Sequence, residues 1–489
     1  MNPLLLTDGY KVDHRRQYPT GTTLVYSNWT PRKSRYSDID EVVLFGLQYF
    51  IKKYILEDFE TYFFKQPKEK VVAEYSRRIN NYLGENQVGT KHIADLHDLG
   101  YIPMVIKSLP EGASVPLRVP MFTMYNTKPE FFWLTNYFET LLSAIIWMPC
   151  TSATIAKQYR TVLDRYAQET SSVPEFVQWQ GHDFSMRGMS GIEAGLTSAC
   201  GHLLSFTGTD TIPAINLLEN YYNADSDKEL IGGSVAATEH SVMCMGTTEG
   251  ELETFRRLVC DIYPKGIVSI VSDTWDLWKV LTEYLPALKN EILARDGKVV
   301  IRPDSGDPVD IICGDPHGKS DVERKGVIEL LWETFGGHTN AKGYKELAPQ
   351  IGAIYGDSIT VERAVQICER LKEKGFSSTN IVFGIGSYTY QFNTRDTFGF
   401  AMKATYGEVH GEGREIFKDP VTDDGTKKSA KGLIKIEREN DTYILHDQVS
   451  WEEERQGELK EVFRDGKLLI DYTLAEIRRR LQNPLGGNE

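Results

Sequence analysis

Short β-rich runs alternate with helical segments from about residue 176 to residue 386, and this alternation most limits how the chain can fold. Strands are expected at 176–184, 202–208, 233–237, 266–271, 298–302, 352–355 and 380–383. Helices are expected between them, including 248–263, 274–294, 321–335 and 360–374. Parallel strands need long crossovers, usually helices, and these crossovers are right-handed. The pattern therefore predicts an α/β fold with a parallel sheet.

Residues suited to binding or catalysis follow the same end of each expected strand. In chain order they are Phe184 and Arg187, Asp210, Glu239 and His240, Asp273, Arg302 and Asp304, Asp357, and Gly386. Groups collected at the carboxyl ends of successive strands are typical of a (β/α) barrel, whereas an open doubly wound sheet concentrates them at one switch point. About seven units are visible, so we expect an irregular (β/α) barrel.

The flanking segments have a mixed character. Helices are expected at 41–53 and 70–83, and strands at 101–109 and 114–119. We therefore expect two domains. Residues 151–399 would form the catalytic barrel, and residues 1–150 together with 400–489 would form an α+β domain wrapping it.

Charge and composition exclude several classes of protein. The chain has 55 Lys and Arg against 69 Asp and Glu, a net charge of −14, so its field repels nucleic acid and anionic membranes. Six scattered cysteines include no C-x-x-C pair, which argues against a zinc site or disulfide framework. The most apolar stretch, 141–148, is far below the roughly 20 residues that span a bilayer. The apolar run near the N-terminus, three leucines followed by charged residues, is too short for the core of a signal peptide. We expect a cytoplasmic protein with no nucleic acid or membrane partner.

The segment VVIRPDSGDP at 299–308 is the most informative motif. Arg302 and Asp304 are two residues apart and so share one face of the strand end. Arg can fork onto a phosphate, and Asp can bind Mg²⁺ or ribose hydroxyls. The alternative is an internal Arg–Asp ion pair, although the small residues Ser305 and Gly306 favour a site where backbone N–H groups approach an anion.

Two further turns have the character of phosphate sites. The segment IVFGIGSYTY at 381–390 gives a strand and a glycine turn, with the cations Arg395, Lys403 and Lys418 later in the chain. This is a glycine cradle with supporting cations, or simply a tight turn. In IYGDSIT at 354–360, Asp357 or Ser358 is either an N-cap or part of an anion site. Both roles are compatible.

His240 and Asp210 each have a functional and a structural interpretation. His240 stands at a strand end, where an imidazole can act as acid, base or phosphate acceptor, or can be structural. Asp210 lies in FTGTDT. An ionised carboxylate only accepts hydrogen bonds, so in a pocket it would favour an N–H donor and repel an anion. Otherwise Asp210 is a turn or cap residue.

Nine motifs occur in one order along nearly the whole chain: LLLTDGYKVDHRRQYP, VYSNWTPRK, HDFSMRG, FTGTDT, SVAATEHS, IVSDTWD, VIRPDSGDP, IYGDSI and FGIGSYTYQFNTRD. Together they resemble the nicotinamide phosphoribosyltransferases of bacteria and phages, which are type II phosphoribosyltransferases. The resemblance implies a barrel of the nicotinate/quinolinate phosphoribosyltransferase type. It also implies transfer of phosphoribose from PRPP (phosphoribosyl pyrophosphate) to nicotinamide in NAD salvage, giving nicotinamide mononucleotide and pyrophosphate. Mg²⁺, ATP as co-substrate and a homodimer with a shared active site are implied as well.

The resemblance also assigns roles to residues. Phe184 would stack on one face of nicotinamide and Tyr10 of the partner subunit on the other, while Asp210 would accept the carboxamide N–H. His240 would be phosphorylated by ATP. The implied nicotinamide-site residues are Tyr10, Phe184, Arg187, Asp210, Ser234 and Ser269; the PRPP and phosphate residues are Arg32, Arg187, Arg302, Asp304, Gly356, Asp357, Gly386, Ser387, Arg395, Lys403 and Lys418; the catalytic residues are His240, Asp304, Asp357 and Arg302; and the metal residues are Asp273 and Asp304.

One departure and three alternatives stand beside this interpretation. Ser387 and Tyr388 replace glycines found in animal members. A tyrosine in this turn would narrow the phosphate or nucleotide site, so the geometry of phosphate binding and the coupling to ATP could differ from those of animal members. The chain could instead be a nicotinate phosphoribosyltransferase, although Asp210 argues against an acid substrate. It could also be a catalytically silent nucleotide-binding protein. The third alternative is an unrelated phosphate-binding barrel, but that alternative does not explain the N-terminal TDGYK motif.

Overall fold

The computed structural model describes residues 1–356, 358–417 and 430–482. The chain forms two compact units. The first unit comprises Met1–Thr154, Asn216–Asp225 and Asn393–Glu489, and the second, here called the barrel unit, comprises Ile155–Ile215 and Ser226–Phe392. Helices α6 (Glu139–Thr170) and α9 (Ile212–Tyr221) contain residues of both units.

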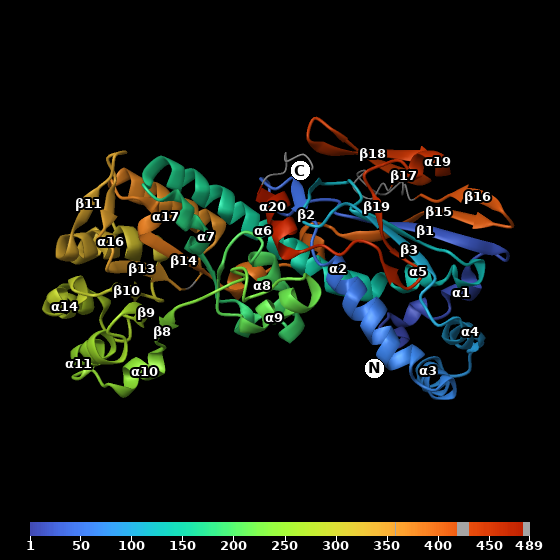
Figure 1. Cartoon of the computed structure of the whole chain (residues 1–489), viewed down its shortest axis with the longest axis horizontal. Helices are drawn as coiled ribbons and strands as arrows, with labels where there is room; N and C mark the ends of the chain where they lie inside the picture. Colours follow the sequence, from blue (N-terminus) through green and yellow to red (C-terminus); the bar gives the residue numbers. More distant parts are fainter. Residues whose placement is uncertain (357, 418–429, 483–489) are drawn as a thin grey trace. The chain divides into compact units, whose positions relative to one another are not determined.

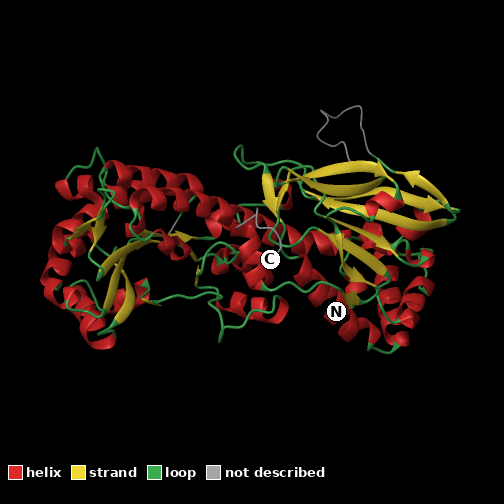
Figure 2. Cartoon of the chain, turned by 45° about the horizontal axis from the view of Figure 1, so that its top comes forward, coloured by secondary structure: helices red, strands yellow, loops and turns green. Residues whose placement is uncertain are grey.

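The first unit is built on a seven-stranded antiparallel sheet, drawn in yellow with its hairpins in Figure 2. Its strands, in spatial order, are β16 (Glu412–Glu415), β15 (Ala401–Val409), β1 (Thr22–Thr30), β5 (Phe122–Asn126), β3 (Met104–Ser108), β19 (Lys460–Arg464) and β20 (Lys467–Leu468). Trp29 on β1 is fully buried and stacks between Phe122 and Phe400, with ring centroids 6.1 and 5.4 Å away. Aromatic burial at the sheet centre is thus a main source of stability for this unit.

Two small strand pairs and several helices complete the first unit. The pairs are β2 (Glu41–Val43) with β4 (Ser114–Pro116) and β17 (Leu433–Glu439) with β18 (Thr442–Val449). The helices are α1 (His14–Gln17), α2 (Leu47–Phe50) continuing into the π-helical η3 (Ile51–Asp58) and η4 (Glu60–Phe64), α3 (Lys68–Leu83), α4 (Lys91–Leu99), α5 (Leu134–Tyr137), α19 (Trp451–Glu454) and α20 (Leu474–Gln482).

The helix expected at 41–53 is wrong in its first part. Val42 pairs in register with Val115, so residues Glu41–Val43 form strand β2. Gly46, at φ 103°, then turns the chain, and the helix begins at Leu47. Pairing with a distant strand has overridden the helical spacing of the apolar residues. The helix α3 and the strands β3 and β4 are confirmed, with small shifts at their ends.

The barrel unit contains a seven-stranded parallel sheet in the order β7-β6-β14-β13-β10-β9-β8 (Figure 1). The strands are β6 (Gly181–Asp183), β7 (Gly208–Thr209), β8 (Ala236–Ala237), β9 (Gly266–Val271), β10 (Gly297–Arg302), β13 (Ile351–Tyr355) and β14 (Ile381–Ile385). The two edge strands also approach each other, because Thr209 N–H donates to Gly233 O at 3.0 Å and Gly233 N–H donates to Thr207 O at 2.8 Å. The strands therefore curl into an irregular barrel, and the predicted fold class is confirmed.

Helices precede, connect and follow the strands of the barrel, in addition to α9 between β7 and β8. They are α7 (Val177–Gln180), α8 (Ile192–His202), α10 (His240–Met245), α11 (Glu251–Arg256) continuing as η8 (Arg257–Ile262), α12 (Leu277–Lys279), η9 (Val280–Tyr284), α13 (Leu285–Ala287), α14 (Lys289–Leu293), α15 (Pro308–Cys313), α16 (Asp321–Phe335), α17 (Val361–Glu373) and α18 (Ser387–Tyr390). The strand expected at 176–184 is wrong up to residue 180, which is helical. Gln180 Nε2 donates to Ser378 O and Ile381 O, and these bonds tie that helical turn to the chain entering β14. Only the last part of the strand expected at 202–208 is β structure, because α8 runs to His202.

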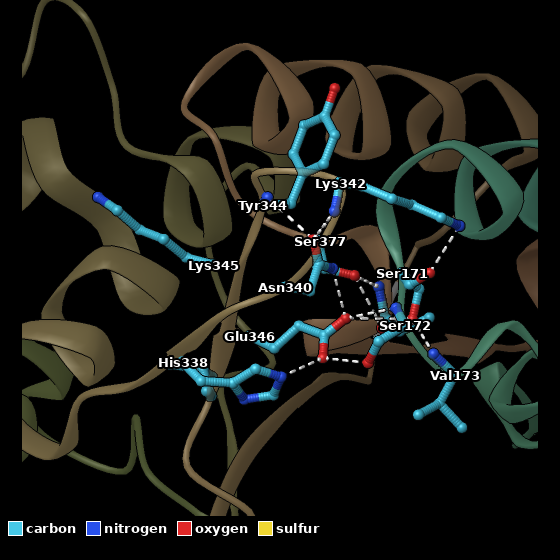
Figure 3. Close-up of polar contacts among 12 residues, drawn as sticks. Ser171, Ser172, Val173, His338, Asn340, Lys342, Tyr344, Lys345, Glu346 and Ser377 are labelled. Atoms are coloured by element: carbon cyan, nitrogen blue, oxygen red, sulfur yellow. Dashed lines mark hydrogen bonds and ion pairs between the residues drawn. The ribbon is translucent and has the colours of Figure 1, made fainter.

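A polar network attaches the hairpin β11 (Gly337–Thr339) and β12 (Lys345–Leu347) to the end of α6, as Figure 3 shows. Glu346 accepts hydrogen bonds from Ser172 N at 2.7 Å, Ser172 Oγ at 2.6 Å and Asn340 Nδ2 at 2.8 Å. Asn340 and Lys342 also donate to backbone carbonyls at the end of α6. Burial alone would raise the pKa of Glu346, but the bonds from Ser172 and Asn340 outweigh it and lower that pKa. These contacts satisfy helix-end carbonyls and are structural.

Among the described residues, no single helix is long and apolar enough to cross a bilayer. One bent pair, Pro129–Tyr137 with Glu139–Thr170 at 42°, meets that criterion jointly by length and composition.

Candidate active site

A cavity of about 700 Å³ lies at the carboxyl ends of the barrel strands. Its lining includes seven of the residues singled out from the sequence: Phe184, Arg187, Asp210, Glu239, Arg302, Asp304 and Gly356. Arg302 is the last residue of β10, and the others come from the segments that follow β6, β7, β8, β10 and β13. The structure thus brings these residues together around one cavity, and their roles stay predictions. This is the edge at which (β/α) barrels build their active sites.

Glycines on neighbouring strands make room for the side chains that point into the barrel. A Cβ atom at Gly208 would lie 2.7 Å from His182 Nδ1, and one at Gly384 would lie 2.8 Å from Phe184 Cδ2. A Cβ at Gly356 would lie 2.2 Å from Asp304 Oδ1. All three distances are shorter than a Cβ atom tolerates, so any larger residue would displace His182, Phe184 or Asp304.

Asp210 is held by two donors on the same oxygen. His182 Nε2 lies 2.8 Å from Asp210 Oδ1, and Ser234 Oγ donates to that oxygen at 2.7 Å. Burial alone would raise the pKa of Asp210, but His182, Ser234 and the charge of Arg302 lower it. The carboxylate therefore stays ionised and half-exposed at the cavity.

Asp183, which the sequence analysis did not single out, holds the ends of β6 and β7 together. It is fully buried. Its Oδ1 accepts from Ser185 N at 3.0 Å and Ser185 Oγ at 2.6 Å, while Oδ2 accepts from Thr209 Oγ1 at 2.8 Å and Thr211 Oγ1 at 2.7 Å. These four bonds fix the turn that carries Phe184. The sequence signal was an Asp followed two residues later by Ser, which is a common turn pattern.

Arg302 and Asp304 lie at the end of β10. Arg302 Nη2 donates to Thr238 O at 2.8 Å, and its Nε is 3.7 Å from Asp304 Oδ2. Arg302 and Asp304 thus form a long ion pair, as the alternative interpretation of this motif predicted. Both residues nevertheless line the cavity. One guanidinium and one carboxylate can therefore face the same ligand.

Asp273 links this strand end to His240. Its Oδ2 accepts from Asp304 N at 2.8 Å and Ser305 Oγ at 2.6 Å. Its Oδ1 is buried, has no hydrogen bond among the described residues, and lies 3.5 Å from His240 Nε2. The His240 side chain is half exposed, at the start of α10. Asp273 can therefore orient the imidazole while holding the Asp304 loop.

Among the described residues, the other predicted members of the barrel unit do not line this cavity. Ser269 Oγ on β9 is buried and makes no hydrogen bond within the described part of the chain. Gly386 precedes α18, and Ser387 packs against the turn that carries Arg187, because a Cβ at Gly188 would lie 2.0 Å from Ser387 Oγ. Ser387 thus occupies space beside that turn.

Four of the predicted residues that the structure describes belong to the first unit. Tyr10 is 62% exposed, with Lys11 beside it bound to Glu139. Arg32 Nε donates to Gly399 O at 2.9 Å. Arg395 pairs with Asp396, and Lys403 lies on β15. Their roles stay predictions. Asp357 and Lys418 lie outside the described residues.

The residues implied as magnesium ligands suit a metal held largely by its substrate. Among the described residues, the group of three potential ligands with metal spacing is Glu437, Glu439 and His446 in the first unit, not Asp273 and Asp304. Mg²⁺ often takes only one or two carboxylates and completes its shell with water and substrate phosphates. Asp304 lines the cavity and its backbone N–H donates to Asp273 Oδ2, so the two carboxylates lie next to each other, as such a site requires.

Comparisons with known proteins agree with this geometry. Residues 179–467 match the nicotinate phosphoribosyltransferase (NAPRTase) family, and residues 2–106 match the N-terminal domain of nicotinamide phosphoribosyltransferase. The nicotinamide phosphoribosyltransferase of Acinetobacter baylyi is 56% identical, over 99% of this chain and 98% of that protein. The protein of the same name from Mycoplasma pneumoniae is 39% identical, over 88% of this chain and 94% of its own length.

Solved structures support the fold. The nicotinate-nucleotide pyrophosphorylase of Pyrococcus furiosus superposes with a TM-score of 0.57 at 14% identity, covering 98% of this chain and 93% of that one. Human nicotinic acid phosphoribosyltransferase superposes with a TM-score of 0.54 at 14% identity, with the same coverage. Fold, cavity and sequence relatives lead to one conclusion: the chain is an enzyme of the nicotinamide phosphoribosyltransferase family.

Proposed function

We propose that this enzyme transfers phosphoribose from PRPP to nicotinamide, giving nicotinamide mononucleotide and pyrophosphate in NAD salvage. The observation that carries the proposal is Asp210, an ionised carboxylate at the cavity beside the Phe184 ring. It can accept the carboxamide N–H of nicotinamide and repels the carboxylate of nicotinate. The relatives that share the chain's full length carry the same activity in their names.

The reaction needs alignment and charge neutralisation more than covalent help. The lone pair of the ring nitrogen forms the new bond to the anomeric carbon, while the bond to pyrophosphate breaks and its electrons leave with the oxygen. Phe184 would fix the plane of the ring, and Arg302 would neutralise a phosphate. Asp304 would face the ribose hydroxyls and the developing positive charge of the sugar. Mg²⁺ bound by Asp273, Asp304 and the substrate would neutralise the leaving pyrophosphate.

ATP coupling is a second part of the proposal. An imidazole that is half exposed, and 3.5 Å from a buried carboxylate oxygen, has the geometry of an oriented nucleophile. A His240 nitrogen would form a bond to the γ-phosphorus of ATP while the bond to the β-phosphate oxygen breaks and ADP leaves, and water would later cleave the N–P bond and release phosphate. The Nε2 of His240 faces Asp273, so Nδ1 is the nitrogen open to the phosphoryl group. Asp273 would fix the ring and stabilise its positive charge.

A homodimer with a shared site is the third part. Tyr10 is held on a short turn between Asp8, which accepts a hydrogen bond from Thr140, and Lys11, which is bound to Glu139. The anchoring leaves the Tyr10 ring exposed. An exposed, firmly held aromatic ring suits stacking on a ligand in the partner subunit.

The first experiment mixes the protein with Mg²⁺ and PRPP and supplies either nicotinamide or nicotinate, with and without ATP. Mass spectrometry identifies the mononucleotide formed. We expect nicotinamide mononucleotide, with a higher yield when ATP is present. Product mainly from nicotinate would refute the assignment of Asp210, and no product from either would favour a nucleotide-binding protein.

A further inference from the structure

The side chain of His182 contacts Asp210. It lies on β6, is mostly buried, and its Nε2 is 2.8 Å from Asp210 Oδ1. A carboxylate whose pKa is lowered only accepts hydrogen bonds. The imidazole nitrogen in this contact must therefore carry the hydrogen.

Ser234 donates to the same oxygen, at 2.7 Å. The two donors come from neighbouring segments of the barrel. Strand β6, which carries His182, pairs with β7, and the residue before Ser234 pairs with Gly208 of β7. Among the described residues, all the side-chain hydrogen bonds of Asp210 fall on Oδ1. Oδ2 is left to accept a donor from the cavity.

The position of the His182 ring is built into the barrel wall. Gly208, its register partner on β7, leaves the space that the ring fills. On its other side the ring contacts Phe184, with centroids 4.6 Å apart and planes inclined by 43°. The imidazole thus touches both the carboxylate and the aromatic ring assigned to the nicotinamide.

We propose that His182 is a positioning and specificity-determining residue, which occupies Asp210 Oδ1 so that Oδ2 is presented to the carboxamide N–H. This inference rests on the proposed function, because it concerns the same pocket. Without the imidazole, the carboxylate can turn about its Cβ–Cγ bond, and neither oxygen is reserved for the ligand. The donor geometry, not the charge of the ring, carries the effect.

Two variants separate the donor from the bulk of the side chain. His182→Gln keeps an N–H donor the same number of bonds from the backbone, whereas His182→Leu fills similar space without a donor. We expect His182→Leu to raise the KM for nicotinamide about tenfold or more, the size of one lost hydrogen bond to a charged group. Its kcat and its KM for PRPP should stay within about threefold of wild type. His182→Gln should restore most of the nicotinamide KM.

Three outcomes overturn the proposal. One is an unchanged nicotinamide KM in His182→Leu. Another is equal damage in both variants, and the third is a loss confined to kcat or to PRPP. A merely structural role would lower stability and would impair kcat and both KM values together, so melting temperatures are measured alongside.

A second measurement does not depend on activity. Nitrogen-15 NMR of histidine-labelled protein identifies the His182 signals as those lost in His182→Gln. We expect a hydrogen on Nε2, and a neutral ring with its hydrogen on Nδ1 alone overturns the proposal. Should the wild-type protein fail to use nicotinamide while Nε2–H is found, the proposed function fails and the positioning of Asp210 stands.

Discussion

Replacing Asp210 with Asn should invert the selectivity of the pocket. The two side chains have the same shape, so Asn Oδ1 can still accept from His182 and Ser234. The other position then changes from an acceptor oxygen to an N–H₂ donor. Nicotinamide loses a charged acceptor, and nicotinate gains a donor while a like charge is removed.

The size of the change follows from two contributions. Losing one hydrogen bond to a charged group costs nicotinamide about 2 kcal/mol, or roughly 30-fold. Two negative charges 4 Å apart repel by about 4 kcal/mol at an effective dielectric constant of 20. Asp210 is half exposed, and Arg302 lies nearby, so we take about half of that repulsion, again roughly 30-fold. The ratio of kcat/KM values for the two substrates should therefore shift by about 1000-fold.

The assay measures kcat/KM for each substrate at saturating PRPP and identifies each product by mass. The matched control is Glu373→Gln, which removes one negative charge from α17, a helix with no described residue in the cavity lining. The control should leave the ratio unchanged. An Asp210→Asn enzyme with wild-type selectivity and full activity would show that the carboxamide is recognised elsewhere.

Three other changes test separate parts of the molecule. His240→Ala should abolish stimulation by ATP while basal transfer continues, measured as mononucleotide formed with and without ATP; undiminished stimulation would exclude His240 as the phosphoryl acceptor. Gly356→Ala places a Cβ 2.2 Å from Asp304 Oδ1 and should raise the KM for PRPP about tenfold with little effect on nicotinamide; an unchanged KM for PRPP would contradict the ribose role of Asp304. Burial raises the pKa of Glu111 to about 7 from 4.5, so its contribution to stability is complete below pH 4.5 and is lost as pH rises through 7. Relative to Glu111→Gln, wild type should lose about 3 kcal/mol of unfolding free energy between pH 4.5 and pH 8; parallel urea-unfolding curves of the two proteins across that range would contradict it.

The barrel was predictable because its signal is local and repeated. Strands such as β9 and β10 are apolar runs bounded by turns, and each is followed by a helical segment. The polar residue after each strand then had to lie at one edge of the sheet. For this reason the amino-acid sequence was sufficient to predict that Asp210, Arg302 and Asp304 lie close together, and they line one cavity.

The failures come from interactions between distant segments. Glu41–Val43 is a strand because of β4, and 177–180 is helical because Gln180 bonds to the chain entering β14. His182 was not predicted because a single His in a short β-rich run has no pattern of its own. Its importance depends on which neighbour faces it, and that neighbour is 28 residues away.

The order of segments in the first unit has a consequence during synthesis. Strand β1 lies between β5 and β15, and its pairing with β15 joins Thr22 to Val409. At 5–20 residues per second, one edge of β1 waits about 20–80 s for its partner while the barrel unit is made. An unpaired strand edge is a template for aggregation. The nascent chain should therefore depend on ribosome-associated chaperones until β15 emerges, although the barrel unit can already close.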